Sequence, residues 1–255
     1  MPRNKAANLY ARVYGCSHSS YFHCNEPERK RLDDSREWPI VGGKVIASAS
    51  VAGFRPKAST LSTKEIITKG CVDANRLVLA FGQVDLELGY YYRNAVKGEA
   101  IKPRDYVDWL ADIYAAFVSG IAFPKDNIAI KGVNLTVLTD PDFTFSYAKR
   151  IVSRRIPKQE RPPYSTKLRQ EILSEDAQNE MSLHFNEKVQ EFCADIGCRY
   201  FDVNDFLAKK DENGIAQPKL GVDRTFIPGR TDHHIADSIP VREAHLSALL
   251  KAFKD

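Results

Sequence analysis

The sequence predicts a three-layer α/β/α fold of the flavodoxin-like type, in which helices cover both faces of a central, mostly parallel sheet. Short apolar runs rich in β-branched residues alternate with longer segments of helical character. The runs are nearly continuous, which suits strands that are buried on both faces. With 255 residues and 43% hydrophobic content, the chain can bury a substantial core. We expect one domain spanning residues 1–255.

Five apolar runs are the expected strands, at residues 9–14, 44–49, 76–81, 134–138 and 198–203. The principal helices are expected at residues 62–71, 104–123, 174–197 and 241–253. Ser62, with Glu65 three positions later, is a typical helix opening. In the second helix an apolar stripe predicts core packing rather than a cofactor-binding face; it comprises Tyr106, Trp109, Leu110, Ile113, Tyr114 and Phe117.

Two polar regions, residues 23–43 and 140–170, interrupt this alternation of strands and helices. The first is rich in charged residues, and the second combines charges with four prolines, Pro141, Pro157, Pro162 and Pro163. Charge and proline at this density favour excursions from the edge of the sheet. The expected domain therefore carries two such excursions.

Composition limits the classes of partner and compartment. The formal net charge of +4 is dispersed along the chain, which argues against nucleic-acid binding. No segment approaches the roughly 18 apolar residues of a membrane span, and the amino terminus lacks the apolar segment of a signal peptide. The five cysteines are an odd number without paired spacing, which favours reduced thiols. We expect a soluble cytoplasmic protein, of oligomeric state left open by the sequence.

Polar and glycine-containing segments follow four of the expected strands. They read GCSHSS, SASVAGFRP, FGQVDLELGYYYR and DVNDF, and a late histidine cluster, GRTDHHIADS, precedes the final helix. In open parallel sheets the functional groups gather beyond the carboxyl ends of the strands. We therefore expect these loops to converge on one site.

The order of these blocks resembles the SGNH hydrolases, the GDSL-type esterases and acyltransferases. Gly15-Cys16-Ser17 stands where the family carries its nucleophilic serine. Gly53 matches the glycine whose N–H helps to form the oxyanion hole, and Gly82-Gln83-Val84-Asp85 matches the third block. The late sequence TDHHI, residues 231–235, matches the block with the catalytic histidine. The resemblance implies an α/β/α fold and acyl-ester chemistry with Ser17 as nucleophile.

Several positions depart from the family pattern. Cys16 replaces an aspartate that is not the nucleophile, and Val84 replaces an asparagine that would donate to the oxyanion. Loss of one such donor lowers the rate about 100- to 1,000-fold. Either Gln83 supplies a substitute amide, or the backbone N–H groups of Ser17 and Gly53 suffice, or the activity is weak. In the last block, His234 fits the family histidine best, which places Thr231 at the usual aspartate position.

The residue types support the same chemistry directly. A serine hydroxyl needs a neighbouring base, and imidazole has an unperturbed pKa of about 6.5. His233 or His234 could be that base for Ser17, and Asp232 could orient the ring. The expected reaction is acyl-ester hydrolysis or acyl transfer, with no metal and no cofactor. O-acetylated carbohydrate is the expected substrate class, and Tyr91 in the tyrosine run after Asp85 could stack on a sugar ring.

Other interpretations remain open at this stage. Cys16, His18, His23 and Cys24 offer four potential zinc ligands within nine residues, although adjacent His23 and Cys24 suit a structural zinc site poorly. Cys16 could itself be a thiol nucleophile. A non-catalytic domain that binds a glycan or a phosphate-bearing ligand on the same loops is the main alternative to an enzyme. Taken alone, GCSHSS could also be a polar turn.

Overall fold

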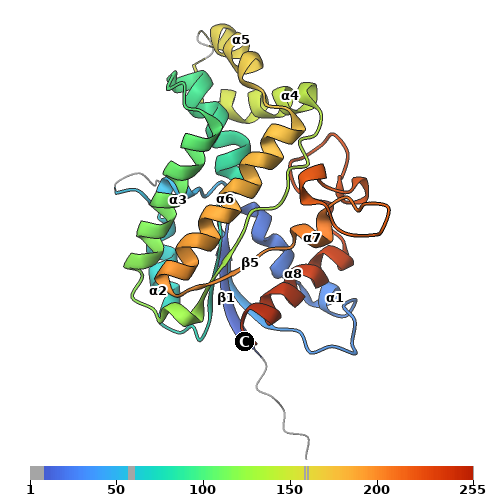
Figure 1. The fold of residues 1–255 in the computed structure, drawn as a ribbon. Helices are drawn as coiled ribbons and strands as arrows, with labels where there is room; N and C mark the ends of the chain where they lie inside the picture. Colours follow the sequence, from blue (N-terminus) through green and yellow to red (C-terminus); the bar gives the residue numbers. More distant parts are fainter. Residues whose placement is uncertain (1–8, 57–60, 158, 160, 255) are drawn as a thin grey trace, which may run out of the picture.

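A five-stranded parallel sheet forms the centre of the molecule (Figure 1). The computed structural model describes residues 9–254 apart from 57–60, 158 and 160. The strand order is β2-β1-β3-β4-β5. The strands are β1 (Tyr10–Gly15), β2 (Ile40–Val45), β3 (Leu77–Ala80), β4 (Ile128–Lys131) and β5 (Arg199–Phe201).

Helices cover both faces of this sheet, which confirms the predicted three-layer fold. Successive residues of a strand point to opposite faces. Accordingly Leu77 and Leu79 of β3 pack in the core formed with α3 and α6, whereas Val78 packs with Leu246 and Leu249 of α8 on the other face. In Figure 1 the sheet lies between α3 and α6 on one side and α8 on the other. That one domain comprises the whole chain stays a prediction.

All four principal helices that the sequence predicts are present. They are α2 (Thr63–Cys71), α3 (Pro103–Gly120), α6 (Glu175–Ile196) and α8 (Ile239–Ala252). Ser174 caps α6 by accepting a hydrogen bond from the Ala177 N–H, and Gly197 ends it at a φ of 80°. The expected cap at Ser62 is wrong, because this residue has a left-handed backbone and its side chain makes no capping bond in the described structure.

The two polar regions contain regular structure. Residues 140–170 form α4 (Pro141–Val152) and α5 (Arg161–Glu171), joined in part by a short 3-10 turn, η6 (Ser153–Arg155). The aspartate before Pro141, Asp140, caps α4 by accepting from the Phe143 N–H. Residues 23–43 contain α1 (Glu26–Arg29) and the start of β2. Proline at the first turn of α4 therefore starts a helix rather than a loop.

The second strand begins four residues earlier in the chain than the sequence predicts. The strand expected at 44–49 lies at Ile40–Val45, and it includes the glycine pair Gly42-Gly43. Gly43 has a φ of +98°, and a Cβ there would lie 2.1 Å from the Val13 carbonyl oxygen of β1. This edge strand therefore requires a glycine at its closest approach to β1.

The strand expected at 134–138 is wrong, and the true fourth strand precedes it at Ile128–Lys131. Residues 133–136 are buried, but side chains rather than a neighbouring strand satisfy their N–H groups. The acceptors are the amide oxygens of Asn186, Gln83, Asn204 and Asn179, for the N–H groups of Val133, Asn134, Leu135 and Thr136 in that order. A buried apolar run can therefore resemble a strand without any ladder bonds.

The strand order creates a switch point beside β1. The chain leaves β1 for β2 on one side and then returns to β3 on the other side. Ligand sites of open α/β sheets lie at the carboxyl edge where the order reverses. The segments that follow β1 and β3, which begin at Cys16 and Phe81, therefore meet there.

The described structure also bears on the predictions about membrane spans and cysteines. Within the described part of the chain, no helix combines the length and apolar character needed to cross a membrane. All five cysteines are free thiols, as expected. The first eight residues, on which the absence of a signal peptide was judged, lie outside the described part.

The 3-10 helix η1 (Ser17–Phe22), which follows β1, packs against α8 through His245. The ring centroid of His245 lies 4.9 Å from that of Tyr21 and 5.3 Å from that of Phe22. Burial, together with the nearby charge of Lys131, lowers the pKa of His245 from 6.5 to about 3. The imidazole is therefore neutral in the folded protein over most of the acidic range.

This burial predicts a pH-dependent contribution to stability. Because the folded-state pKa lies below the unfolded value, the contribution is fully present above that value and is lost as pH falls through the window between them. In His245→Leu, the free energy of unfolding should fall less steeply between about pH 4 and 6, by about 1.4 kcal/mol per pH unit. Urea denaturation at several pH values measures the slope, and an unchanged slope would contradict a buried neutral imidazole.

Candidate active site

The turn after β1 presents Ser17 at the switch point. Cys16 N–H donates to the Ala80 carbonyl at 3.2 Å, which ties the turn to β3, and η1 then begins at Ser17. A Cβ on Gly15 would lie 2.5 Å from both the Ala80 oxygen and the Ser19 Cβ. Only glycine permits this close approach, and the chain turns sharply enough to leave Ser17 half-buried at the edge of the sheet.

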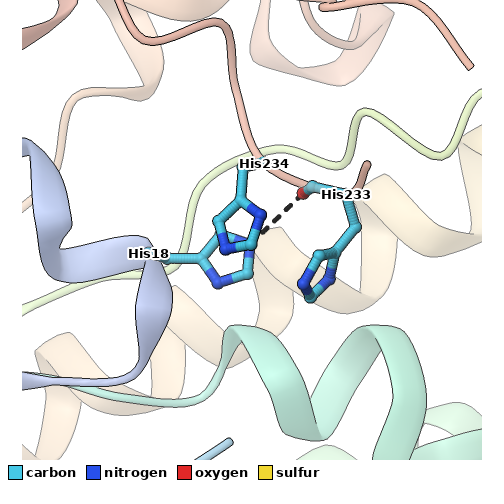
Figure 2. Close-up of side chains that lie close together, drawn as sticks. All are labelled: His18, His233 and His234. Carbon is cyan, nitrogen blue, oxygen red and sulfur yellow. Dashed lines mark hydrogen bonds between the residues drawn. The ribbon is translucent and has the colours of Figure 1, made fainter. Parts of the chain in front are cut away.

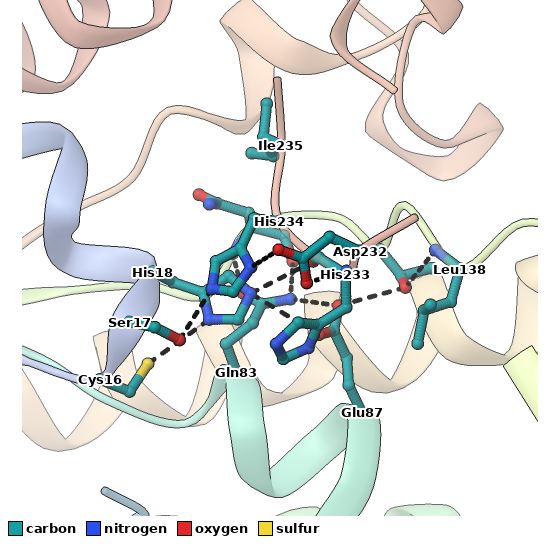
Figure 3. Close-up of polar contacts among 12 residues, drawn as sticks. Cys16, Ser17, His18, Gln83, Glu87, Leu138, Asp232, His233, His234 and Ile235 are labelled. Atoms are coloured by element: carbon teal, nitrogen blue, oxygen red, sulfur yellow. Dashed lines mark hydrogen bonds and ion pairs between the residues drawn. The ribbon is translucent and has the colours of Figure 1, made fainter. Parts of the chain in front are cut away.

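Ser17, His234 and Asp232 form a continuous hydrogen-bonded chain (Figure 3). His234 Nε2 lies 2.7 Å from Ser17 Oγ, and His234 Nδ1 lies 2.8 Å from Asp232 Oδ2. The other carboxylate oxygen of Asp232 accepts from the His233 N–H at 2.7 Å and from the Tyr147 hydroxyl at 3.2 Å. The structure thus brings together three residues that are 217 positions apart at most.

The electrostatics of Asp232 keep it ionised. Burial would raise the pKa of this carboxyl, but the His233 N–H and the His234 imidazole outweigh that effect, and the pKa lies below its usual value. A carboxylate can only accept, so His234 Nδ1 carries the hydrogen and Nε2 presents its lone pair to the Ser17 hydroxyl. This is the tautomer that a general base requires.

His233 has a different environment from His234. Its side chain is buried, and its Nδ1 lies 2.8 Å from Glu87 Oε2. His234 is therefore the histidine that faces Ser17, and His233, the other candidate base, is held in the interior. Although the spacing of the TDHHI block is irregular, the Asp232 carboxylate bonds the His234 ring. The ring therefore does not need an acidic residue at position 231, where the chain has Thr231.

Glu87 is the centre of the buried polar network. Its Oε1 accepts from the Gln83 side-chain amide at 2.9 Å and from the Thr136 hydroxyl at 3.2 Å, while Oε2 faces His233. Glu87 lies in the π-helical turn η3 (Asp85–Gly89), and its partners come from the residues just before η3, from the segment after β4 and from the late histidine loop. Sequence reasoning missed Glu87, because nothing in FGQVDLELGYYYR distinguishes this carboxylate from a surface residue.

His18, also missed as a site residue except as a potential zinc ligand, lies against the ring of His234. The two ring centroids are 4.2 Å apart, with an interplanar angle of 24°. His18 Nε2 lies 3.2 Å from the His233 carbonyl oxygen and 3.7 Å from Glu87 Oε2. Burial, together with the neighbouring His233 and His234, lowers the pKa of His18 well below its usual value of 6.5. His18 is therefore neutral.

The three histidines form a potential metal-binding group. Among the described residues, His18, His233 and His234 form the one group of three or more potential ligands, with ligand atoms within 4.8 Å of one another. An imidazole binds a metal in the plane of its ring, but the rings of His18 and His234 are stacked on one another (Figure 2), and the lone pair of His234 Nε2 faces the Ser17 hydroxyl. Tetrahedral ligation needs converging lone pairs. The geometry suits a hydrogen-bonded cluster better than a metal site.

The environment of Cys16 tests two hypotheses: that Cys16 is a thiol nucleophile, and that it is one of four zinc ligands. Its side chain is 1% exposed, and burial raises the pKa of the thiol to about 12. A thiol nucleophile there is wrong, because a buried neutral thiol is inert. Cys24 lies beside the guanidinium of Arg242 at 3.7 Å, and neither it nor His23 joins the histidine group. The four-ligand zinc site is therefore also wrong.

Gly53 and Gln83 were expected to serve as oxyanion donors, and the structure corrects both expectations. The Gly53 N–H already donates within its own turn, to the Ser50 carbonyl at 3.1 Å and the Ser50 hydroxyl at 3.2 Å. The Gln83 amide is buried, donating to Glu87 and to the Asn134 carbonyl. Val84 has no donor in its side chain. The remaining candidate donor to the oxyanion is the backbone N–H of Ser17, the first residue of η1. An N–H at the start of a helix has no acceptor within that helix.

The side chains of Asp85 and Tyr91, which were expected near the substrate, instead bond backbone groups of the protein. The Asp85 carboxylate accepts from the N–H groups of Val51 at 2.7 Å and Ala52 at 3.1 Å, and so holds the 3-10 helix η2 (Val51–Phe54). Burial raises the pKa of Asp85 to about 7. Tyr91 is 0% exposed, so the expectation that it binds substrate is wrong. Its hydroxyl accepts from the Leu173 N–H instead.

Comparison with solved structures places this site on a known fold. The chain is similar to an extracellular lipase from Streptomyces rimosus, with a TM-score of 0.51 and 12% identity over 96% of this chain and 99% of the lipase. It is also similar to Est24, a carbohydrate acetylesterase from Sinorhizobium meliloti, with a TM-score of 0.48 and 12% identity over 96% and 99% of the two chains. No protein-family model and no curated protein matches the sequence. The likeness to the lipase supports the three-layer α/β/α fold that the sequence predicted.

The buried network predicts a large effect of removing the Glu87 carboxylate. Glu87→Ala leaves the donors of Gln83, Thr136 and His233 unpaired in the interior, and should lower the free energy of unfolding by about 3–5 kcal/mol. Glu87→Gln retains one oxygen acceptor and should lose less. Urea denaturation measures both.

The matched control for this substitution is Glu191→Ala. Glu191 is an exposed glutamate whose side chain pairs only with Lys188, at 2.6 Å, among the described residues. Its removal should change the free energy of unfolding by less than about 0.5 kcal/mol. Equal effects of Glu87→Ala and Glu191→Ala would contradict the central role of Glu87.

Proposed function

We propose that the protein is a serine-dependent acyl-ester hydrolase in which Ser17 is the nucleophile, His234 the general base and Asp232 the residue that orients it. The observation that carries this proposal is the unbroken chain of 2.7 Å and 2.8 Å contacts from Ser17 Oγ through His234 to Asp232. Such a chain is recognised by geometry and by the role of each group, whatever the fold.

The geometry supports a two-step reaction. His234 Nε2 takes the Ser17 hydroxyl proton as Oγ attacks the ester carbonyl carbon, giving a tetrahedral oxyanion. Collapse of this intermediate breaks the bond to the alcohol, which leaves with the proton from His234, and Ser17 holds the acyl group. Water, or an acceptor alcohol in acyl transfer, then attacks the acyl carbon while His234 takes its proton. The bond from the acyl carbon to Ser17 Oγ breaks, and His234 returns the proton to Oγ, which restores the serine hydroxyl. Asp232 stabilises the imidazolium in both steps.

The neighbours of His234 support its role as a base. Because His18 is neutral, its stacked ring adds no positive charge that would oppose protonation of His234. The contact between His233 and Glu87 fixes the residue before His234, and so fixes the position of the base. These groups position the base and are not themselves proposed to touch the substrate.

The oxyanion would rest on fewer donors than the family pattern provides. The Ser17 N–H is the donor supported by position, while Val84 offers none and Gly53 N–H is engaged with Ser50. Each missing donor lowers the rate about 100- to 1,000-fold. We therefore expect a slow esterase on small, activated esters. The proposed substrate class, a small acyl group such as acetyl on a carbohydrate, rests on the resemblance in the sequence blocks.

The second candidate is a non-catalytic domain that binds a ligand on the same loops. The engaged N–H of Gly53 and the buried amide of Gln83 favour it, since an esterase needs donors aimed at the oxyanion. A reactive probe separates the two candidates, because it reports an activated serine even when the natural substrate is unknown.

A fluorophosphonate probe should label the wild-type protein at Ser17. Ser17→Ala should abolish labelling, and His234→Ala should slow it at least about 1,000-fold, because the hydroxyl then lacks its base. Asp232→Asn should also slow it, since the amide can hold the wrong imidazole tautomer. Intact mass and peptide mapping locate the adduct, and hydrolysis of 4-nitrophenyl acetate gives the rates.

Ser20→Ala is the matched control, because Ser20 lies in the same 3-10 helix but makes no contact with His234 in the described structure. It should be labelled at the wild-type rate. A folded wild-type protein that is neither labelled nor active would overturn the esterase and leave the binding domain.

A further inference from the structure

A cavity of about 310 Å³ is lined by segments that also carry residues of the candidate active site. It is formed by η2, by the π-helical turns η3 (Asp85–Gly89) and η4 (Tyr92–Lys97), and by the end of α4. Two segments of the lining connect it to the site already described. Val84 directly follows Gln83, whose side chain bonds Glu87. Helix α4, which also lines the cavity, carries the Tyr147 that bonds Asp232. Its volume is in the range of small-ligand pockets.

Three basic side chains line this cavity: Arg55, Arg93 and Lys97. The guanidinium carbons of Arg55 and Arg93 both lie over the indole of Trp109, at 5.2 Å and 4.1 Å from its centroid. Because both guanidinium groups line the same cavity, a negatively charged ligand bound there would be attracted to both of them.

The carboxylates nearby neutralise these three cations only in part. Glu99 pairs with Arg93 at 2.5 Å and reaches Lys97 only at 3.9 Å. In the part of the chain that the structure describes, no carboxylate forms an ion pair with Arg55, whose Nε donates to the Ala52 carbonyl at 2.9 Å. Asp85 lines the cavity, but both its oxygens already accept backbone N–H groups. The lining therefore has an excess of positive charge.

We infer that this cavity binds an anionic group of the substrate, a carboxylate or a phosphate, and that the ester cleaved at Ser17 belongs to an acidic molecule such as an O-acylated acid sugar. Guanidinium groups match both anions in shape and charge. The ester half of this inference rests on the proposed function, whereas the binding of an anion does not. The two halves are therefore tested separately.

The first experiment measures binding without chemistry. Isothermal titration compares glucose, glucuronate and glucose 6-phosphate, which share a ring and differ in charge. We expect at least one of the two anions to bind about tenfold more tightly than glucose, and the tighter one identifies the group recognised. Added salt should weaken that preference, because screening reduces the attraction. Equal affinity for all three overturns the inference, whatever the outcome at Ser17.

Substitutions then locate the anion. Arg55→Gln, and separately the more exposed Lys97→Gln, should each reduce the preference for the anion over glucose about three- to tenfold. Arg36→Gln is the matched control: Arg36 is an exposed arginine that also lies over an indole, 5.9 Å from the centroid of Trp38, and does not line the cavity. It should keep the full preference. If the folded Arg55→Gln and Lys97→Gln variants both keep it as well, the anion binds elsewhere and the inference fails.

The second experiment measures catalysis. The kcat/KM for acetylated glucuronate should exceed that for acetylated glucose at least about tenfold, with most of the difference in KM, and Arg55→Gln should reduce this ratio. A ratio near one in an active wild-type enzyme overturns the substrate assignment. If neither ester is cleaved and Ser17 is not labelled, the proposed function fails, while the titration still decides whether the cavity binds anions.

Discussion

The contact between Glu87 and His233 is the interaction on which the site depends. It joins two parts of the chain that are 146 positions apart, the helical turns after β3 and the loop before α8. The contact is buried. Among the described residues, Gln83 and Thr136 donate to the other oxygen of the Glu87 carboxylate, and the more distant His18 also faces the carboxylate. Because the next residue is His234, fixing His233 also fixes the imidazole that faces Ser17.

The same packing explains why the late loop can depart from the usual spacing. An aspartate directly before His233 would be badly placed if His233 were the base, since its carboxylate is bonded to the His233 N–H. With His233 turned into the interior, the carboxylate of Asp232 reaches His234 Nδ1 at 2.8 Å. The extra histidine is thus an anchor for the loop, and the catalytic pair is formed by the residues on either side of it.

Much of the fold could be predicted from the sequence, because β1, β3 and β5 are apolar runs and α3, α6 and α8 have helical spacing. The fourth strand could not, since the four residues Ile128–Lys131 are a weaker apolar signal than the run that follows. In that run, amide side chains from distant residues replace the ladder bonds, and no local pattern indicates them. Ser17 and His234 were singled out by the order of the blocks, whereas Asp232 was suggested by the need of an imidazole base for a carboxylate, because the block pattern places Thr231 at the aspartate position. The buried roles of Glu87, Gln83 and Tyr91 did not, since burial depends on contacts that lie far apart in sequence.

The central claim is that Ser17, His234 and Asp232 act as one unit, and a crystal structure of the phosphonylated protein tests it most directly. The account predicts a phosphorus atom bonded to Ser17 Oγ, with His234 still held by Asp232 and a phosphoryl oxygen facing the Ser17 N–H. The Gly53 N–H should stay bonded to Ser50 in the adduct. A phosphonyl group on another residue, or a His234 ring that has left Asp232 in the adduct, would contradict the account.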